Sequence, residues 1–268
     1  MKQIEKTIYD FLQRHPAETV NLVLDSTGPS LTKHYLALSA IGTENLAKFK
    51  KIHTFSGGTF AYFGFLAAAN NNCRHALPEY YKNLDRTMRR AHTELVPVLP
   101  PAIRFLRKKA FYNSAAPIES VIRYVFKDDF LASPASSLEK NFTAYYAPSK
   151  GQDQALIQFS SGKTISGIDT VFDVIRYAVN IPFLYGRNGQ MSDPAFHPAY
   201  RRALKTVANS GEPALVVTPW KSGEKGSTLY LNPFAPANQK LVMGRDILCL
   251  LTNIPNPTYG RDLKAIFG

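Results

Sequence analysis

The residues best suited to chemistry surround Ser56, where a short strand-like run changes abruptly into an apolar helix. Residues 51–55 form the strand-like run, and the helix is expected from residue 57 to residue 69, where polar asparagines stop it. A serine on so tight a turn projects its hydroxyl in front of the unpaired N–H groups of the helix N-terminus. This arrangement is typical of a nucleophile whose reaction places negative charge on a nearby oxygen.

The residues around Ser56 also fit a simpler interpretation. Gly58 has no side chain at the point where the strand and the helix must pass closely. In the simpler interpretation Ser56 only caps the helix, and the glycines only allow the chain to turn. Because short Gly/Ser motifs recur by chance, these residues alone do not decide between a nucleophile and a cap.

Composition is that of an ordinary folded protein. Of the 268 residues, 45% are hydrophobic and 19% are charged, which excludes a disordered chain. The sequence contains no apolar run long enough to span a membrane, and residues 1–19 lack the pattern of a signal peptide. A location in the cytoplasm or at the periphery of a membrane is therefore expected, with signal-independent export left open. Cys73 and Cys249 have no zinc-site spacing, so no metal and no cofactor are expected.

The net charge of +12 indicates an anionic partner, either nucleic acid or an anionic membrane surface. Residues 82–127 hold ten Lys and Arg against three acidic residues, which is more than half of the net charge. Aromatic residues are interleaved with these cations, as in surfaces that lie at the level of lipid headgroups. A solvated helical lid with its apolar face in the core fits the same stretch equally well. No nucleic-acid-binding motif occurs, so nucleic acid is not the expected partner.

The order of the expected elements predicts an α/β fold with a mainly parallel sheet and helices on both faces. The apolar spacing predicts helices over 2–14, 35–41, 57–69, 168–180 and 199–210, and strands over 20–24, 52–55, 142–147, 155–159 and 214–218. Strands 142–147 and 155–159 are joined by a hairpin-like connection. No internal repeat and no linker divides the chain, so a single domain over residues 1–268 is expected.

Three separated motifs occur in an order that resembles the patatin-like phospholipase family. Thr54–Gly58 corresponds to the G-x-S-x-G box of that family, and residues 26–30 correspond to its glycine-rich oxyanion loop. Asp193–Ala195 corresponds to its aspartate box and follows a similar helix end, residues 178–182. The resemblance implies a three-layer α/β/α sandwich with a mainly parallel central sheet. It also implies that the basic, aromatic segment 77–137 is a helical insertion or lid.

The resemblance implies a serine lipid acyl hydrolase of the phospholipase A, lysophospholipase or esterase type. Ser56 would be the nucleophile and Asp193 its general base, in a dyad without histidine or cofactor. The backbone N–H groups of Thr27, Gly28 and Gly57 would form the oxyanion hole. The substrate would be a phospholipid or another acyl-ester lipid, met at an anionic membrane surface.

Several departures from the family pattern favour an alternative, a catalytically inactive domain that acts as a basic lipid- or partner-binding module. Thr54 replaces the first glycine of the elbow, and Gly28 is the one glycine that remains in the upstream loop. Ser30 stands where the family usually has arginine, with Lys33 as the nearest cation. His34 does occupy a position where the family often has histidine.

Two further alternatives concern the partners of Ser56. Asp193 lies in Ser-Asp-Pro, a common turn sequence, so it also fits a structural turn. An α/β-hydrolase triad of Ser56, Asp173 and His197 follows the chain order of that class. However, His197 comes only four residues after Asp193, with no strand between them to present it separately.

Overall fold

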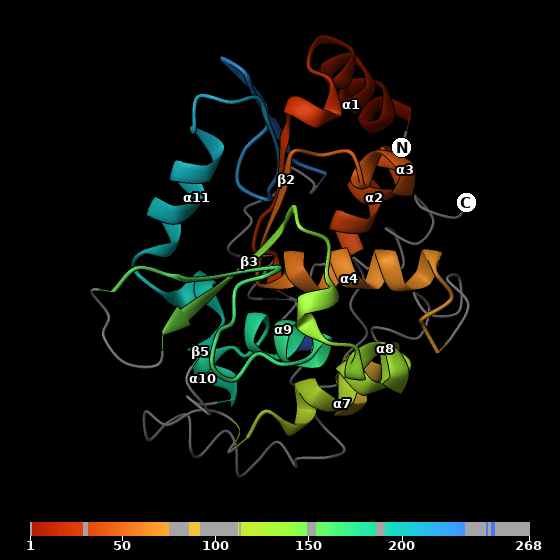
Figure 1. Cartoon of the computed structure of the whole chain (residues 1–268), viewed down its shortest axis with the longest axis vertical. Coiled ribbons are helices and arrows are strands. Elements are labelled where there is room, and N and C mark those ends of the chain that lie inside the picture. Colours follow the sequence, from red (N-terminus) through yellow and green to blue (C-terminus); the bar gives the residue numbers. More distant parts are fainter. Residues whose placement is uncertain are drawn as a thin grey trace.

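The fold is organised around a mixed sheet of mostly parallel strands, with helices on both of its faces (Figure 1). The structure is a computed structural model that describes residues 2–28, 32–74, 86–91, 112, 114–148, 154–185, 191–233, 245 and 248–249. The strands are β1 (Asn21–Leu24), β2 (Lys51–Phe55), β3 (Phe142–Pro148), β4 (Ile157–Ser160), β5 (Met191–Ser192), β6 (Ala214–Val217), β7 (Gly223–Lys225) and β8 (Thr228–Leu231).

The strand order is β4-β3-β2-β1-β6-β8-β7, with β5 paired to the end of β3. The pairs from β3 through β2, β1 and β6 to β8 are parallel, while β4, β5 and β7 pair antiparallel at the margins. In β1, Asn21 lies opposite Lys51 of β2 and Ala214 of β6. The predicted α/β class with a mainly parallel sheet is confirmed. Loops that follow β1, β2 and β6 therefore meet at one edge of the sheet.

The described helices surround this sheet unequally. They are α1 (Lys2–Arg14), α2 (Thr32–Ile41), α3 (Thr43–Leu46), α4 (Gly57–Ala69), α7 (Ala116–Val125), α8 (Asp128–Ala132), α9 (Val171–Ala178), α10 (Pro182–Tyr185) and α11 (Tyr200–Ala208). Helices α1, α2, α4 and α9 lie on one face, whereas α11 lies on the other (Figure 1).

The two faces of β1 show how strand alternation builds two cores. Leu22 and Leu24 belong to the larger apolar cluster, together with buried residues of α1, α2, α4 and α9. Val23, which points the other way, belongs to a smaller cluster with Tyr200 and Ala208 of α11. All four residues of β1 are buried, as expected for a central parallel strand.

Helix α9 is shorter than the 168–180 helix predicted from its apolar spacing. The Thr170 hydroxyl accepts the N–H of Asp173 at 3.3 Å, and the Asp173 carboxylate accepts the N–H of Thr170 at 3.1 Å. This capping box fixes the first helical residue at Val171. The helix ends at Ala178, and Pro182 then begins α10.

The predicted insertion over 77–137 is described only in part, at residues 86–91, 112 and 114–137. Val121 and Ile122 of α7 and Leu131 of α8 lie in the larger core cluster, so these helices pack into the main body. The basic run 104–109 lies outside the described residues. Its contact with an anionic surface therefore stays a prediction.

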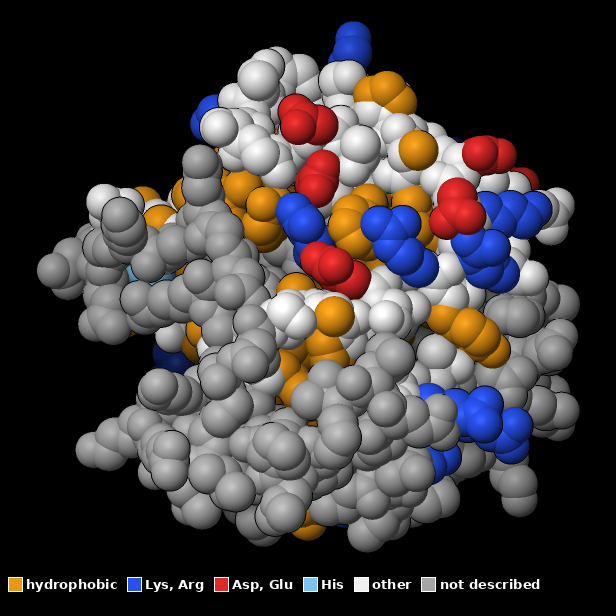
Figure 2. All heavy atoms as spheres, turned by 90° about the horizontal axis from the view of Figure 1, so that it is seen from below, with side chains coloured by type: hydrophobic (Ala, Val, Ile, Leu, Met, Phe, Trp, Pro, Cys, Tyr) orange, Lys and Arg blue, Asp and Glu red, His pale blue; other side chains and the backbone are white. Residues whose placement is uncertain are grey.

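Figure 2 shows the face of the molecule that lies at the bottom of Figure 1. The described part of this face carries basic and acidic side chains side by side (Figure 2). Arg176 of α9 lies 3.4 Å from Glu119 of α7 and 3.2 Å from Asp173, and Arg74 lies 2.6 Å from Asp128 of α8. Among the described residues, no helix combines the length and the apolar composition needed to cross a membrane.

Candidate active site

Ser56 is the single residue between β2 and α4, and its backbone is strained. Its φ of 51° and ψ of −124° lie in a region that residues with a side chain rarely adopt. Such a conformation costs about 1–3 kcal/mol and persists only where the surrounding structure enforces it. The Ser56 side chain makes no capping hydrogen bond to α4. Ser56 therefore occupies the N-cap position of α4 without capping it through its side chain, and the strained turn has the geometry of a nucleophile elbow.

Two glycines allow the first turn of α4 to approach the end of β1. A Cβ atom on Gly58 would lie 2.8 Å from the carbonyl carbon of Leu24 and 2.9 Å from the carbonyl oxygen of Asp25. A Cβ atom on Gly57 would lie 2.9 Å from both the Gly28 carbonyl oxygen and the Thr27 hydroxyl. The helix N-terminus thus packs directly against the loop that follows β1.

Gly58→Ala is expected to lower the free energy of unfolding by about 3 kcal/mol, because the new methyl group meets backbone atoms that cannot rotate away. Gly162→Ala is the control, since Gly162 has a φ of 83° but open space around its Cβ position. The control should show only the backbone strain of about 1–2 kcal/mol. Urea unfolding of both variants measures the difference, and equal losses would contradict this packing.

Thr54, two residues before Ser56, packs between β2, β3 and α4 without breaking the turn. Its side chain is fully buried; its hydroxyl accepts a hydrogen bond from Thr59 of α4 at 3.0 Å. It donates a long hydrogen bond of 3.5 Å to the carbonyl oxygen of Thr143 in β3. Thr54 thus adds a polar contact between β2, β3 and α4.

Asp193 is brought to Ser56 by the turn that follows β5. Its N–H donates to the Asn180 carbonyl oxygen at 3.0 Å, which anchors it to the end of α9. One carboxylate oxygen, Oδ1, accepts the N–H of Ala195 at 2.8 Å and caps the 3₁₀ turn Pro194–Phe196. The other, Oδ2, accepts the Ser56 hydroxyl at 2.5 Å. Asp193 therefore serves both the turn predicted for Ser-Asp-Pro and the contact with the serine.

Burial makes the Asp193 carboxyl a stronger base than an ordinary aspartate. The residue is 1% exposed, and desolvation raises its pKa to about 7 even though the hydrogen bonds from Ser56 and Ala195 act in the opposite direction. A base whose pKa lies near neutrality is well matched to removing a hydroxyl proton at physiological pH. Perturbed carboxyls of this kind concentrate at functional sites.

The predicted oxyanion donors lie around the same point. Within the described residues, the N–H groups of Thr27, Gly28 and Gly57 meet no hydrogen-bond acceptor. Gly28 has a φ of 54°, a conformation that favours glycine. The Thr27 hydroxyl is also buried without a partner in the described part of the chain, and the sequence patterns did not single it out. The Thr27 hydroxyl and the Gly28 N–H lie close to Gly57, the residue that follows Ser56.

A second buried carboxyl, Asp25, anchors the loop that follows β1 and was missed in the sequence. It accepts the N–H of Ser26 at 2.7 Å, the hydroxyl of Thr218 at 2.6 Å and the hydroxyl of Tyr200. The His34 Nε2–H donates to its carbonyl oxygen at 2.7 Å. Burial raises the pKa of Asp25 to about 6 and lowers the pKa of His34 to about 4, so His34 is neutral. The sequence pattern that could have indicated Asp25 is an aspartate directly after a predicted buried strand.

Tyr200→Phe is expected to lower the free energy of unfolding by about 1–3 kcal/mol at pH 8, because buried Asp25 loses a donor to its charged form. The loss should be smaller at pH 5, where Asp25 is protonated in the folded state. Tyr9→Phe on the exposed face of α1 is the control. Chemical unfolding at both pH values tests this, and an equal loss at pH 5 and pH 8 would contradict it.

The alternative triad is not assembled. Asp173 caps α9 and pairs with Arg176, while His197 Nδ1 accepts the N–H of Ala199 at 3.2 Å. Neither side chain contacts Ser56, whose hydroxyl is bound to Asp193. Ser30 and the side chain of Lys33 lie outside the described residues.

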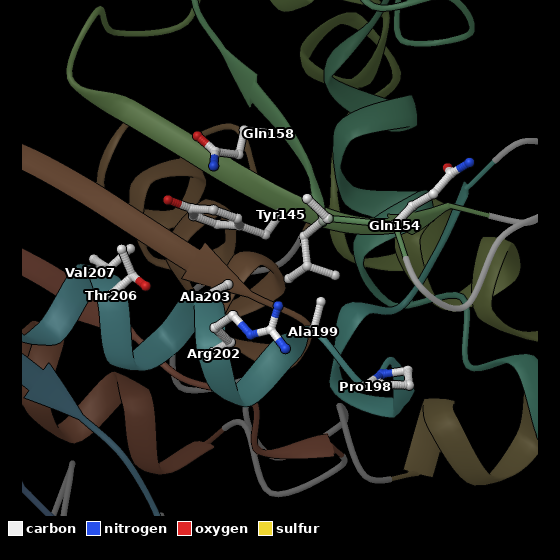
Figure 3. A pocket seen from close by; sticks show the side chains of 11 residues that line it. Tyr145, Gln154, Gln158, Pro198, Ala199, Arg202, Ala203, Thr206 and Val207 are labelled. Carbon is white, nitrogen blue, oxygen red and sulfur yellow. The ribbon is translucent and has the colours of Figure 1, made fainter.

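A cavity of about 430 Å³ lies between α11 and strands β3 and β4 (Figure 3). Tyr145 of β3 forms part of its wall. The Tyr145 ring stacks on Phe55 with 4.4 Å between ring centroids, and its hydroxyl shares a 2.9 Å hydrogen bond with Nδ1 of His53. Arg202 lies opposite on α11 (Figure 3). Neither Ser56 nor Asp193 lines this cavity, so it is separate from the reactive groups.

No family model, curated protein or solved structure matches this chain. Among the described residues, no three His, Cys, Asp or Glu side chains gather closely enough to hold a metal ion.

Proposed function

We propose that this chain is a serine ester hydrolase of the patatin-like type that cleaves acyl esters of phospholipids or simpler lipids. The observation that carries the proposal is the 2.5 Å hydrogen bond from the Ser56 hydroxyl to the buried Asp193 carboxylate. The strained turn at Ser56 and the unpaired N–H groups beside it support the same chemistry. A three-layer patatin-like sandwich is compatible with the mostly parallel sheet and its flanking helices.

In the first half-reaction, Ser56 Oγ attacks the acyl carbonyl carbon while its proton passes to Asp193 Oδ2. The carbonyl oxygen becomes an oxyanion that accepts hydrogen bonds from the N–H groups of Thr27, Gly28 and Gly57. One such donor is worth about 3 kcal/mol in the transition state. The bond to the leaving alkoxide then breaks, and Asp193 returns the proton to it, which leaves an acyl ester on Ser56.

In the second half-reaction, a water molecule attacks the acyl carbon of the acyl-Ser56 ester. Asp193 accepts a proton from that water, and the same donors hold the second oxyanion. When the bond between the acyl carbon and Ser56 Oγ breaks, the proton moves from Asp193 to the serine. The products are a carboxylic acid and the free enzyme, so the cycle needs no cofactor.

The choice of lipid esters is supported by the order of motifs shared with patatin-like phospholipases and by the net charge of +12. The proposal is tested with a fluorophosphonate, which reacts with activated serines. Wild type should be labelled and Ser56→Ala should not. Ester hydrolysis that survives in both Ser56→Ala and Asp193→Ala would contradict the proposal.

An inactive domain that binds an anionic membrane or a partner is the second candidate. It is favoured by the near-complete burial of the dyad, with Ser56 2% and Asp193 1% exposed, and by the sparse glycines of the loop at Gly28. It predicts normal binding to anionic vesicles by Ser56→Ala and no turnover of any ester by wild type. Labelling of wild type by the fluorophosphonate would contradict it.

A further inference from the structure

A cavity of about 280 Å³ lies between α11 and the β6–β8 part of the sheet, and four of its wall residues are cations. Arg201 and Lys205 come from α11, Lys221 precedes β7, and Lys225 ends it. No acidic residue lines this cavity. Four cationic side chains from distant parts of the sequence thus line one cavity.

These cations have no carboxylate partner among the described residues. Glu224, the acidic residue next to Lys225, is turned away to α1, where Arg14 donates to both of its carboxylate oxygens at 2.6 and 2.8 Å. The Lys221 ammonium lies over the ring of Tyr230, 3.2 Å from its centroid. The Tyr230 ring thus lies beside the Lys221 ammonium, in the position that a counter-ion would otherwise take.

The position of Arg201 on α11 is unfavourable without a bound anion, whereas Lys205 lies in the last helical turn, where a cation is favoured. Arg201 and Lys205 are four residues apart, so they project from the same side of the helix and repel each other. Arg201 also lies in the first helical turn, where the partial positive charge of the helix end disfavours a cation. A bound anion would relieve both repulsions.

The remaining wall residues suit a small organic ligand. Trp220 is 46% exposed and offers an aromatic surface beside the cations, and Tyr230 contributes a second ring. Arg and Lys together are the usual protein partners of phosphate oxygens. The volume admits a phosphate group with a short organic part but not a large cofactor.

We propose that this cavity binds a phosphomonoester, with its phosphate between Arg201, Lys205, Lys221 and Lys225 and its organic part against Trp220. Thr218 also lines the cavity and follows β6, so the site reaches the same edge of the sheet as Ser56. Ligands of open α/β sheets commonly bind at this edge. Neither Ser56 nor Asp193 lines the cavity, so the site stands independently of ester hydrolysis.

The chain carries a single tryptophan, Trp220, so its fluorescence reports directly on this cavity. Glycerol 3-phosphate, a soluble phosphomonoester, should change the emission of wild type along a saturable curve. Lys205→Gln/Lys221→Gln should weaken that binding by about tenfold or more, because two charged contacts are lost. Lys140→Gln/Lys163→Gln, on exposed residues outside the cavity, has the same net charge and should bind within about twofold of wild type.

Vesicles separate the two sources of a phosphomonoester. Sedimentation with phosphatidylcholine vesicles that contain phosphatidic acid, but not with phosphatidylcholine alone, would assign the site to a lipid headgroup. Saturable binding of glycerol 3-phosphate would assign it to a soluble ligand, and either result supports the proposal if the cavity variant loses it and the control variant does not. Equal behaviour of the two double variants, or no response to any of these probes, would overturn it. Circular dichroism checks that both variants are folded.

Discussion

Ser56→Ala is expected to reduce ester hydrolysis by about 10⁴-fold or more, which leaves only what oxyanion donors and binding provide. Alanine has no hydroxyl to form the acyl intermediate, and the Asp193 carboxyl loses its 2.5 Å donor. Steady-state hydrolysis of p-nitrophenyl esters of increasing chain length measures the loss. The fall should appear in kcat, because the N–H groups that we propose as oxyanion donors remain in place.

Ser137→Ala is the matched control for this experiment. Ser137 is an exposed serine whose hydroxyl donates to the Pro134 carbonyl oxygen at 2.6 Å and has no other partner in the described part of the chain. It should hydrolyse esters and accept the fluorophosphonate like wild type. If Ser56→Ala keeps wild-type turnover while its far-ultraviolet spectrum is unchanged, another residue is the nucleophile.

Asp193→Asn is expected to lower kcat by about 10²–10⁴-fold, because an amide cannot take the proton of the Ser56 hydroxyl. In wild type the reaction requires the ionised carboxyl, whose pKa is raised to about 7 by burial. The rate should therefore rise with pH through about 7 and level off above it. In the variant this rise should be absent, while Asp169→Asn, an exposed control, should keep it.

Removal of the Asp193 carboxyl should make the Asp193→Asn variant more stable than wild type. A folded-state pKa raised above the unfolded value means that the folded chain holds the proton more tightly, so stability falls as pH rises from about 4 to about 7. Asparagine carries no charge to bury, so its melting temperature should exceed that of wild type at pH 8, with a smaller difference at pH 4. A wild-type pH–rate profile in Asp193→Asn would remove Asp193 from the mechanism.

Local patterns were sufficient to predict the elements that surround the elbow. The apolar spacing of residues 2–14 and 57–69 matches α1 and α4 in full. The compact run of β1 was predicted within one residue, since a buried strand needs nothing beyond its own apolar side chains. The contact between Ser56 and Asp193 spans 137 positions and could be anticipated only from the order of motifs in a family.

Features that depend on strand order could not be predicted. Asp25, Tyr200 and Thr218 meet because β1 pairs with β6 and α11 crosses both, which no local pattern encodes. The cationic cavity was missed for the same reason. The dense basic run of the sequence is 82–127, whereas the cavity gathers cations from α11, from Lys221 before β7 and from Lys225 at the end of β7.

The position of β1 in the sheet also governs how the chain can be synthesised. In its pairing with β2, Asn21 lies opposite Lys51, which is synthesised 30 residues later. In its pairing with β6, Asn21 lies opposite Ala214, which is synthesised 193 residues later. At translation speeds of about 5–20 residues per second, this delay is on the order of 10 s or more. During that time one edge of a strand that is wholly buried in the finished fold has no partner, and such edges readily recruit other chains. The nascent protein therefore passes through a long interval in which chaperone protection matters more than it does for the finished fold.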